Sequence, residues 1–257
     1  MSIEPDFVLP ALEYEVLWSD LGLGRMPYPL HVPSHGVTAA ERAEVVEQGR
    51  AGLRRRGVLR GGGCDDDLVA ALRLLAAPRV SVDAVGYAGG PLRGLVASDG
   101  RRAVLAALAE DHLAVASVRP TALAGSIVQL LPGAGPGRGP AMTVCADPLL
   151  RAADPGCAED DPLAEGTERD AAVRAGVSPA DVDTLLHLAG GRVGGGQFGV
   201  NTAGRLGAAM RRAPTTVGWF DTAEGRHLLV RHAGWMSLAP ADDRRIAARL
   251  DELLTAT

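Results

Sequence analysis

The amino-acid sequence predicts an α+β protein in which helices pack on a mainly antiparallel sheet. Three observations lead to this class. Stretches with apolar residues at helical spacing are mixed with short alternating or apolar runs typical of strands. Turn signals such as Ser98-Asp99-Gly100 join neighbouring strand patterns, as in hairpins. Each half of the chain reads as two helices, several strands and a helix, and two such halves can merge into one layered sheet.

The N-terminal part is expected to form one short strand and three helices. Thr38 and Glu41 have the spacing of a capping box, which marks the start of a helix. Pro78 ends the third helix, since a proline lacks the N–H that continues the helix. The expected elements are a strand at Ile3–Pro10 and helices at Ala11–Gly22, Thr38–Gly57 and Asp65–Ala77.

Four strands and a helix should complete the first half. Ser81 and Asp83 alternate with apolar residues, which is typical of a strand with one polar face. Arg102–Ala109 fits either a strand or a helix, because alanine is a poor strand former. The expected strands are Val80–Ala84, Leu92–Ala97, Arg102–Ala109 and Leu113–Val118, followed by a helix through Leu123, Ile127 and Leu130.

Two irregular segments separate the halves. Residues 132–140 contain only proline, glycine, alanine and one arginine, so they should form a loop or linker. Residues 154–165 are acidic and poor in large apolar side chains, and we expect a mobile connection there. In the second half we expect helices at Thr167–Ala175, Ser178–Ala189 and Pro240–Leu254, and strands near Gln197–Asn201, Thr215–Phe220, His227–Val230 and Trp235–Leu238.

The chain is expected to be a single domain, 1–257, whose halves are about 1–131 and 163–257. A chain of 257 residues can bury a substantial core without disulfides. The turns Ser98-Asp99-Gly100-Arg101 and Ala223-Glu224-Gly225-Arg226 match loosely, and both precede an apolar strand. An internal duplication would explain this pattern, and so would coincidence.

Composition argues against several functions. The net charge is −5 without a long basic run, which disfavours nucleic-acid binding. All 26 basic residues are arginine, so chemistry that needs a lysine, as in Walker A loops, kinases and pyridoxal phosphate enzymes, is excluded. Cys64, Cys145 and Cys157 form no CxxC pair. With neither a signal peptide nor a membrane-spanning run in view, we expect a cytoplasmic protein with no membrane association.

No catalytic, cofactor-binding or metal-binding residues are predicted. The glycines of Gly190–Gly196 follow a helix and precede a strand, the reverse of a phosphate-binding loop, so we interpret them as a flexible connection. His31 and His35 are four residues apart, but Pro33 makes a helix that would bring them together implausible. The acidic clusters Asp65-Asp66-Asp67 and Glu159-Asp160-Asp161 lack calcium-loop spacing. A nucleophile assembled from distant segments stays an alternative.

Aromatic residues indicate where a partner could bind. Trp219 and Phe220 are adjacent on an expected strand, so they point to opposite faces of the sheet. In one interpretation both are covered by helices. In the other, one of them belongs to a hydrophobic docking face.

Several motifs together resemble one known family. They are ALEYEVLW at Ala11–Trp18, LGLGRMPYPL at Leu21–Leu30, GQFGV at Gly196–Val200, VGWFDT at Val217–Thr222, GRHLL at Gly225–Leu229 and APAD at Ala239–Asp242. In this order they resemble the EspG proteins, cytosolic chaperones of ESX (type VII) secretion. The resemblance covers nearly the whole chain.

The resemblance implies a central antiparallel sheet with flanking helical bundles and an internal quasi-two-fold duplication. It implies a non-enzymatic chaperone, without a cofactor, that keeps a helical PE–PPE-type heterodimer soluble before export, and a weak homodimer is compatible with it. The partner-binding residues suggested by the sheet, an early strand loop and the C-terminal helix are Tyr87, Gly89, Gly90, Leu92, Trp219 and Leu250. The alternative function is a small-molecule-binding or enzymatic α/β protein with an unrecognised site.

Overall fold

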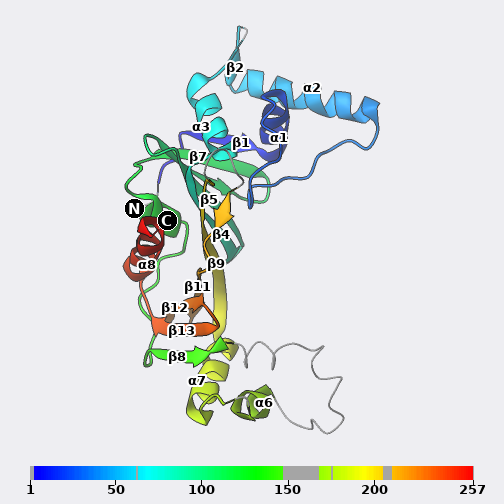
Figure 1. Ribbon diagram of the computed structural model, residues 1–257. Coiled ribbons are helices and arrows are strands. Elements are labelled where there is room, and N and C mark those ends of the chain that lie inside the picture. The colour runs from blue at the N-terminus through cyan, green and yellow to red at the C-terminus, as the bar shows by residue number, and fades with distance from the viewer. Residues whose placement is uncertain (1–2, 62, 147–167, 175, 205–209, 257) are drawn as a thin grey trace. The chain divides into compact units, whose positions relative to one another are not determined.

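The computed structural model describes residues 3–61, 63–146, 168–174, 176–204 and 210–256. These residues form a large antiparallel sheet with helices, which confirms the α+β class (Figure 1). The chain divides into two compact units. The first comprises Met1–Pro132, Phe198–Ala213 and Leu250–Thr257, and the second comprises Gly133–Gln197 and Pro214–Arg249. The acidic connection 154–165 and Cys157 lie outside the described residues.

The sheet of the first unit has the strand order β1-β7-β6-β5-β4-β9, and β10 pairs with β9. Its strands are β1 (Phe7–Pro10), β4 (Val80–Tyr87), β5 (Pro91–Ser98), β6 (Ala103–Leu108), β7 (His112–Val118), the Phe198–Thr202 part of β9 (Arg192–Thr202) and β10 (Arg211–Arg212). From β4 to β7 the strands run as an antiparallel meander. The ambiguous segment Arg102–Ala109 is therefore a strand, and its alanines pack beneath helices on both faces.

Three of the four helices of this unit begin and end close to the predicted positions. They are α1 (Ala11–Asp20), α2 (Ala39–Arg55), α3 (Asp66–Ala76) and the short α4 (Leu123–Val128), with a small hairpin of β2 (Leu59–Arg60) and β3 (Gly63–Cys64) between α2 and α3. The Thr38–Glu41 capping box is present at α2. The carboxylate of Asp65 caps α3 by accepting bonds from the backbone N–H groups of Asp67 and Leu68. The fourth helix, α4, ends earlier than expected.

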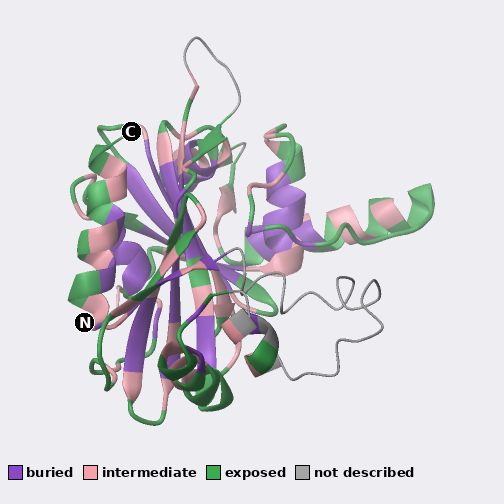
Figure 2. Cartoon of the chain, turned by 60° about the horizontal axis from the view of Figure 1, so that its bottom comes forward, coloured by how far each residue is buried: buried purple, intermediate pink, exposed green. Residues whose placement is uncertain are grey.

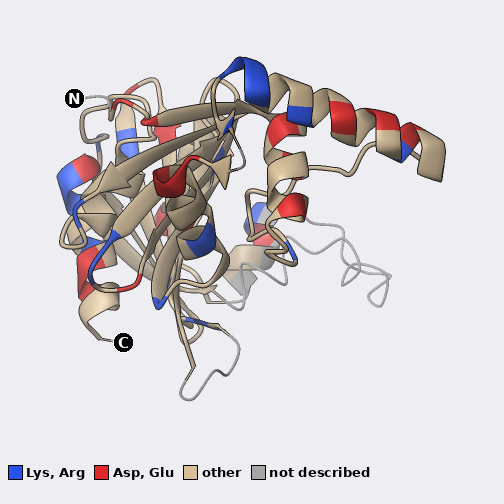
Figure 3. Cartoon of the chain, turned by 90° about the horizontal axis from the view of Figure 1, so that it is seen from above, with Lys and Arg blue, Asp and Glu red and all other residues tan. Residues whose placement is uncertain are grey.

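Charged pairs join α1 to α2, and α2 carries residues of both signs along its length (Figure 3). Arg42 donates both terminal nitrogens to Glu15 at 2.7 Å. Arg50 and Asp20 form a second two-bond pair at 2.8 and 2.7 Å. A Cβ at Gly49 would lie 2.7 Å from Val16, so glycine permits the close approach of the two helices.

Helices cover both faces of the meander. α3 packs on β5 and β6 from one side, and α4 packs on β4, β5 and β6 from the other. Gly94 of β5 leaves room for α4 and its extension, because a Cβ there would lie 2.3 Å from Leu130 and 3.2 Å from Ile127. Leu95, the next residue, belongs to the core beneath α3 with Leu72 and Leu75. Successive side chains of β5 therefore pack alternately against α4 and α3. Figure 2 shows buried residues along the strands of the sheet.

The second unit contains the strand order β9-β11-β12-β13-β8. Its elements are α6 (Glu168–Arg174), α7 (Pro179–Gly190), the first part of β9, β8 (Met142–Cys145), β11 (Thr216–Thr222), β12 (Gly225–His232), β13 (Trp235–Pro240) and most of α8 (Asp243–Thr255). The sequence pattern did not predict β8 or β10. Gly194, Gly195 and Gly196 lie within β9 instead of forming a loop, which corrects the interpretation as a flexible connection.

The Pro/Gly-rich segment is irregular, as predicted, yet it is held against β12. Arg226 donates its backbone N–H to Gly135, and Gly137 donates to Arg226, each at 2.8 Å. His227 Nε2 lies 3.1 Å from the Arg138 carbonyl oxygen. A Cβ at Gly137 would lie 2.1 Å from the His227 ring, so this docking requires glycine. Within the described ranges, no helix combines the length and the apolar character needed to cross a bilayer.

Candidate partner-binding surface

Four of the six residues predicted to bind a partner lie together at the tip of the β4–β5 hairpin. Tyr87 ends β4 with 54% of its surface exposed, and Leu92 of β5 is half-buried. The Ala88 N–H donates to the Gly90 carbonyl at 2.9 Å, and Gly89 has a φ of 78°, which favours glycine. A Cβ at Gly89 or Gly90 would meet no atom within 4 Å, so the tip is open to an approaching molecule.

The other two predicted residues are buried. Trp219 of β11 is 2% exposed, and Leu250 of α8 is fully buried. Phe220 points to the opposite face from Trp219 and stacks on His227, with ring centroids 5.0 Å apart. Burial gives Trp219 and Leu250 a packing role in this conformation. His227 is buried as well.

A buried arginine anchors the second unit. Arg226 is fully buried and donates Nε and Nη2 to Asp221 at 2.7 and 2.8 Å, and Nη1 to Asp243 at the start of α8. Its Cζ lies 5.2 Å from the centroid of the Trp219 ring. Burial lowers the pKa of Arg226, but the hydrogen bond and charge of Asp221, followed by those of Asp243, outweigh burial and raise it. We interpret this network as structural, since the guanidinium at its centre has no exposed surface.

A groove of about 480 Å³ lies in the first unit beside α3, β4 and β9. We call it the Tyr28 groove. Tyr28 is 60% exposed at the rim of the groove, and Met210, the residue before β10, is also exposed. The apolar residues Met26, Tyr28, Leu75, Leu95 and Met210 and the charged residues Arg25, Asp83 and Arg212 line it, with His31 among the polar ones.

The floor of the Tyr28 groove is a buried carboxylate held by two strands. The Asp83 side chain is 2% exposed, whereas that of Arg212 is 41% exposed. Arg212 donates Nη1 and Nη2 to Asp83 at 2.6 and 3.0 Å, and Asn201 donates Nδ2 at 2.8 Å. Asn201 and Arg212 are cross-strand neighbours in β9 and β10, so both reach the same carboxylate. Gly199 provides the space, because a Cβ there would lie 2.0 Å from Cζ of Arg212.

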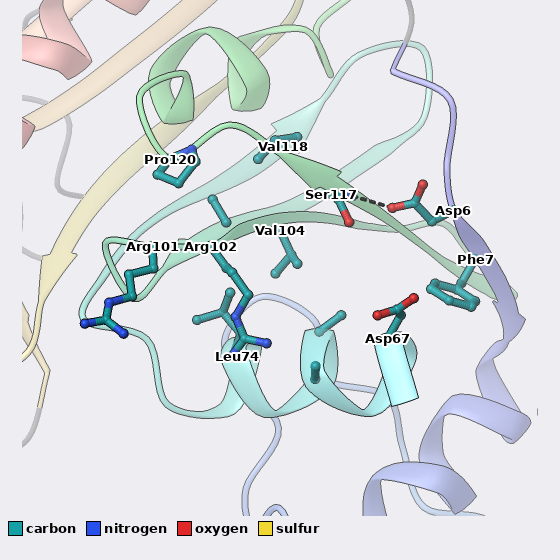
Figure 4. A pocket seen from close by; sticks show the side chains of 13 residues that line it. Asp6, Phe7, Asp67, Leu74, Arg101, Arg102, Val104, Ser117, Val118 and Pro120 are labelled. Atoms are coloured by element: carbon teal, nitrogen blue, oxygen red, sulfur yellow. Dashed lines mark hydrogen bonds between the residues drawn. The ribbon is translucent and has the colours of Figure 1, made fainter. Parts of the chain in front are cut away.

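A second groove of about 510 Å³ lies between α3 and the ends of β6 and β7 (Figure 4). Its floor is apolar, with Leu74 and Val104. Arg101 and Arg102 lie on one side, while Asp67 and Asp6 lie on the other. Asp6 accepts a bond from the Ser117 N–H at 2.6 Å, so it also ties the N-terminal segment to β7. This groove has opposite charges on its two sides and no buried ion pair at its floor.

Among the described residues, no three or more His, Cys, Asp or Glu side chains gather where they could hold a metal ion. His31 lies in the Tyr28 groove and His35 in the connection before α2, where its carbonyl oxygen accepts a bond from Arg42. The aspartates at 65–67 begin α3, as the sequence indicated.

Comparisons with known proteins decide the family. The model of the EspG family matches residues 10–252. The chain belongs to the EspG family. Its fold is similar to that of the Mycobacterium tuberculosis type VII secretion system chaperone EspG5, solved in complex with the PE25–PPE41 dimer. That match has a TM-score of 0.71 and 17% identity, and it covers 94% of this chain and 93% of the other. None of the curated proteins compared with the chain matches it.

The motifs that resemble the EspG family have identifiable structural roles. ALEYEVLW forms α1, whose Tyr14 and Trp18 rings pack edge to face with centroids 5.7 Å apart. The GQFGV segment places Phe198 in the core and leaves Gly199 free for the Arg212 guanidinium. The GRHLL segment contains the buried Arg226. The recognisable EspG residues are therefore mainly those that build the fold.

Sequence reasoning did not find the Tyr28 groove. The alternation around Asp83 predicted a strand but not that Ser81 and Asp83 are both buried. The partner of Asp83 is Arg212, which is 129 residues away in the sequence. A local signal was the aromatic and proline content of the MPYP segment at Met26–Pro29.

Proposed function

We propose that this EspG-family chain is a cytoplasmic chaperone that binds a helical PE–PPE-type heterodimer and keeps it soluble before type VII export. The observation that carries this proposal is the family match over residues 10–252. The similarity in fold to EspG5, which was solved with the PE25–PPE41 dimer, supports the choice of client class. The chain would act by binding alone, without a catalytic step.

The β4–β5 tip is the contact we propose from the sequence. Tyr87 supplies an exposed aromatic ring, and Gly89 and Gly90 keep the backbone accessible. A ring with an apolar body and a polar hydroxyl is well suited to an interface that must be covered reversibly. Leu92 contributes a half-buried side chain beside it. Trp219 and Leu250 are buried, so in this conformation they offer no surface to the client.

We also propose that the chain works as one domain derived by internal duplication, with its helices grouped as bundles beside the sheet. The turns at 98–101 and 223–226 each join antiparallel neighbours, β5 to β6 and β11 to β12. Two packed helices, α6 and α7, precede the strands β9 and β11–β13 of the second half, as α1 and α2 precede the meander β4–β7 in the first. These parallels support a common origin of the halves.

Co-expression tests the client class. The chain is produced with each PE–PPE-type pair of the same genome, and complexes are separated by size exclusion with light scattering. A stoichiometric complex that keeps the pair soluble is expected. The mass of the chain measured alone in the same way reports whether it dimerises weakly. Failure to bind any such pair would contradict the proposal. A small-molecule or enzymatic role, the alternative from the sequence, has no specific geometry in its favour among the described residues.

A further inference from the structure

We propose that the Tyr28 groove binds a polypeptide segment of the client in which an acidic side chain is flanked by apolar residues. This inference rests on the proposed function, since it assigns the occupant to the client. The acidic side chain would pair with Arg212 at the floor and with Arg25 at the rim, and the apolar neighbours would lie against Met26, Tyr28 and Met210.

The charge distribution of the groove calls for an anion. A guanidinium has five N–H donors, and Arg212 uses two of them on Asp83. The remaining donors make no bond to a described residue, and 41% of the side-chain surface is exposed and accessible to a ligand. Asp83 is the one acid among the lining residues, and its charge is already matched by Arg212. Arg25, exposed and without an ion pair to any described residue, leaves the groove net positive.

The walls of the groove call for apolar side chains beside that anion. Tyr28 and Met210 are among the large apolar residues that the described surface leaves exposed, and Met26, which also lines the groove, is half-buried. Methionines fill irregular gaps and adapt to different shapes, and tyrosine combines an apolar ring with a polar hydroxyl. A charged floor between adaptable apolar side chains is suited to bind an acidic residue within an amphipathic segment.

Continuity with the hairpin tip favours a polypeptide over a small carboxylate. Asp83, Val85 and Tyr87 are alternate residues of β4, so they lie on the same face of the strand. Four residues of strand span about 13 Å, the length of roughly two to three turns of helix. One helical segment could therefore reach from Arg212 to the ring of Tyr87 and cover the half-buried Val85 between them.

The experiment uses the full chain and the PE–PPE-type pair that it retains in the co-expression test. The variants are Tyr28→Ala and Arg25→Glu, both at exposed positions, so neither should alter the melting temperature. The matched controls are Trp235→Ala, an exposed aromatic in the second unit, and Arg101→Glu, an exposed arginine of the other groove. Affinity is measured by calorimetry. Each groove variant should weaken binding by at least about tenfold, in the range of interface anchors, and each control by less than about twofold.

A charge exchange identifies the ionic contact. Each acidic residue of the PPE-type chain is replaced in turn by arginine, and one replacement should weaken binding to the wild-type chain yet restore binding to Arg25→Glu. Wild-type affinity in both groove variants, or equal losses in the controls, would overturn the groove while leaving the proposed function intact. If the wild-type chain binds no pair, the proposed function fails first and the assignment of the groove fails with it.

Discussion

Replacing Arg226 by methionine should destabilise the protein by about 3–5 kcal/mol. The substitution keeps most of the apolar stem and removes the guanidinium, which leaves Asp221 with 12% of its side chain exposed and without its cation. Removing one partner of a buried ion pair typically costs this much, because the remaining charge stays desolvated. Asp243 is 44% exposed and can be hydrated, so most of the loss comes from Asp221. Domains of ordinary stability have only about 5–15 kcal/mol to lose.

Urea unfolding followed by tryptophan fluorescence measures this loss, and Trp219 reports on the site because its ring lies against Arg226. The double variant Arg226→Met/Asp221→Leu should recover most of the stability, since neither buried charge remains. The coupling free energy between the two positions should therefore reach at least about 2 kcal/mol. Arg231→Met, at an exposed position of the same strand, should change stability by less than about 0.5 kcal/mol. Purely additive losses in the double variant would refute this account of the network.

Three further substitutions test the first unit. Tyr14→Phe should stabilise the protein by roughly 1 kcal/mol, because the buried hydroxyl has no hydrogen-bond partner among the described residues. Burial raises the pKa of Tyr14 in the folded state, so the free energy of unfolding falls as pH rises above the ordinary tyrosine pKa of about 10. Urea titrations at pH 7–11 should therefore show a smaller loss of stability at alkaline pH in the phenylalanine variant. Gly199→Ala should cost about 1.5–3 kcal/mol by moving Arg212 off Asp83, and an unchanged urea midpoint would contradict that contact. Thr38→Ala should cost about 1 kcal/mol through loss of the capping box with Glu41, as read from the same unfolding curves; no change would indicate that the α2 start frays in the folded protein.

Local chemistry made much of the secondary structure predictable. Thr38 and Ser178 accept bonds from the backbone N–H groups that begin α2 and α7, and such caps depend only on residues a few positions away. Hairpins at Ser98–Gly100 and Ala223–Gly225 were likewise readable, because tight turns need particular residues. β8 and the glycine-rich first part of β9 lacked a local signal and formed because neighbouring strands supplied their hydrogen bonds.

The candidate surface was predictable only in part. The β4–β5 tip could be located because Gly89 and Gly90 mark a turn between strand patterns. Exposure could not be predicted for Trp219 and Leu250, since either face of a strand or helix can become the buried one. Periodicity gives the faces of an element, but only the packing of other elements decides which face solvent reaches.

The sequence by itself determined the α+β class, most helix starts, the hairpins and the resemblance to the EspG proteins, because each depends on neighbouring residues or on motifs in order. Only the tertiary structure decided that the Pro/Gly-rich segment docks on β12 and that Asp83 meets Arg212 at the floor of a groove. Those contacts join residues about 90 and 129 positions apart, and the second forms because β9 and β10 bring Asn201 and Arg212 to β4. A local pattern carries no record of which distant strand will supply the partner of a buried charge.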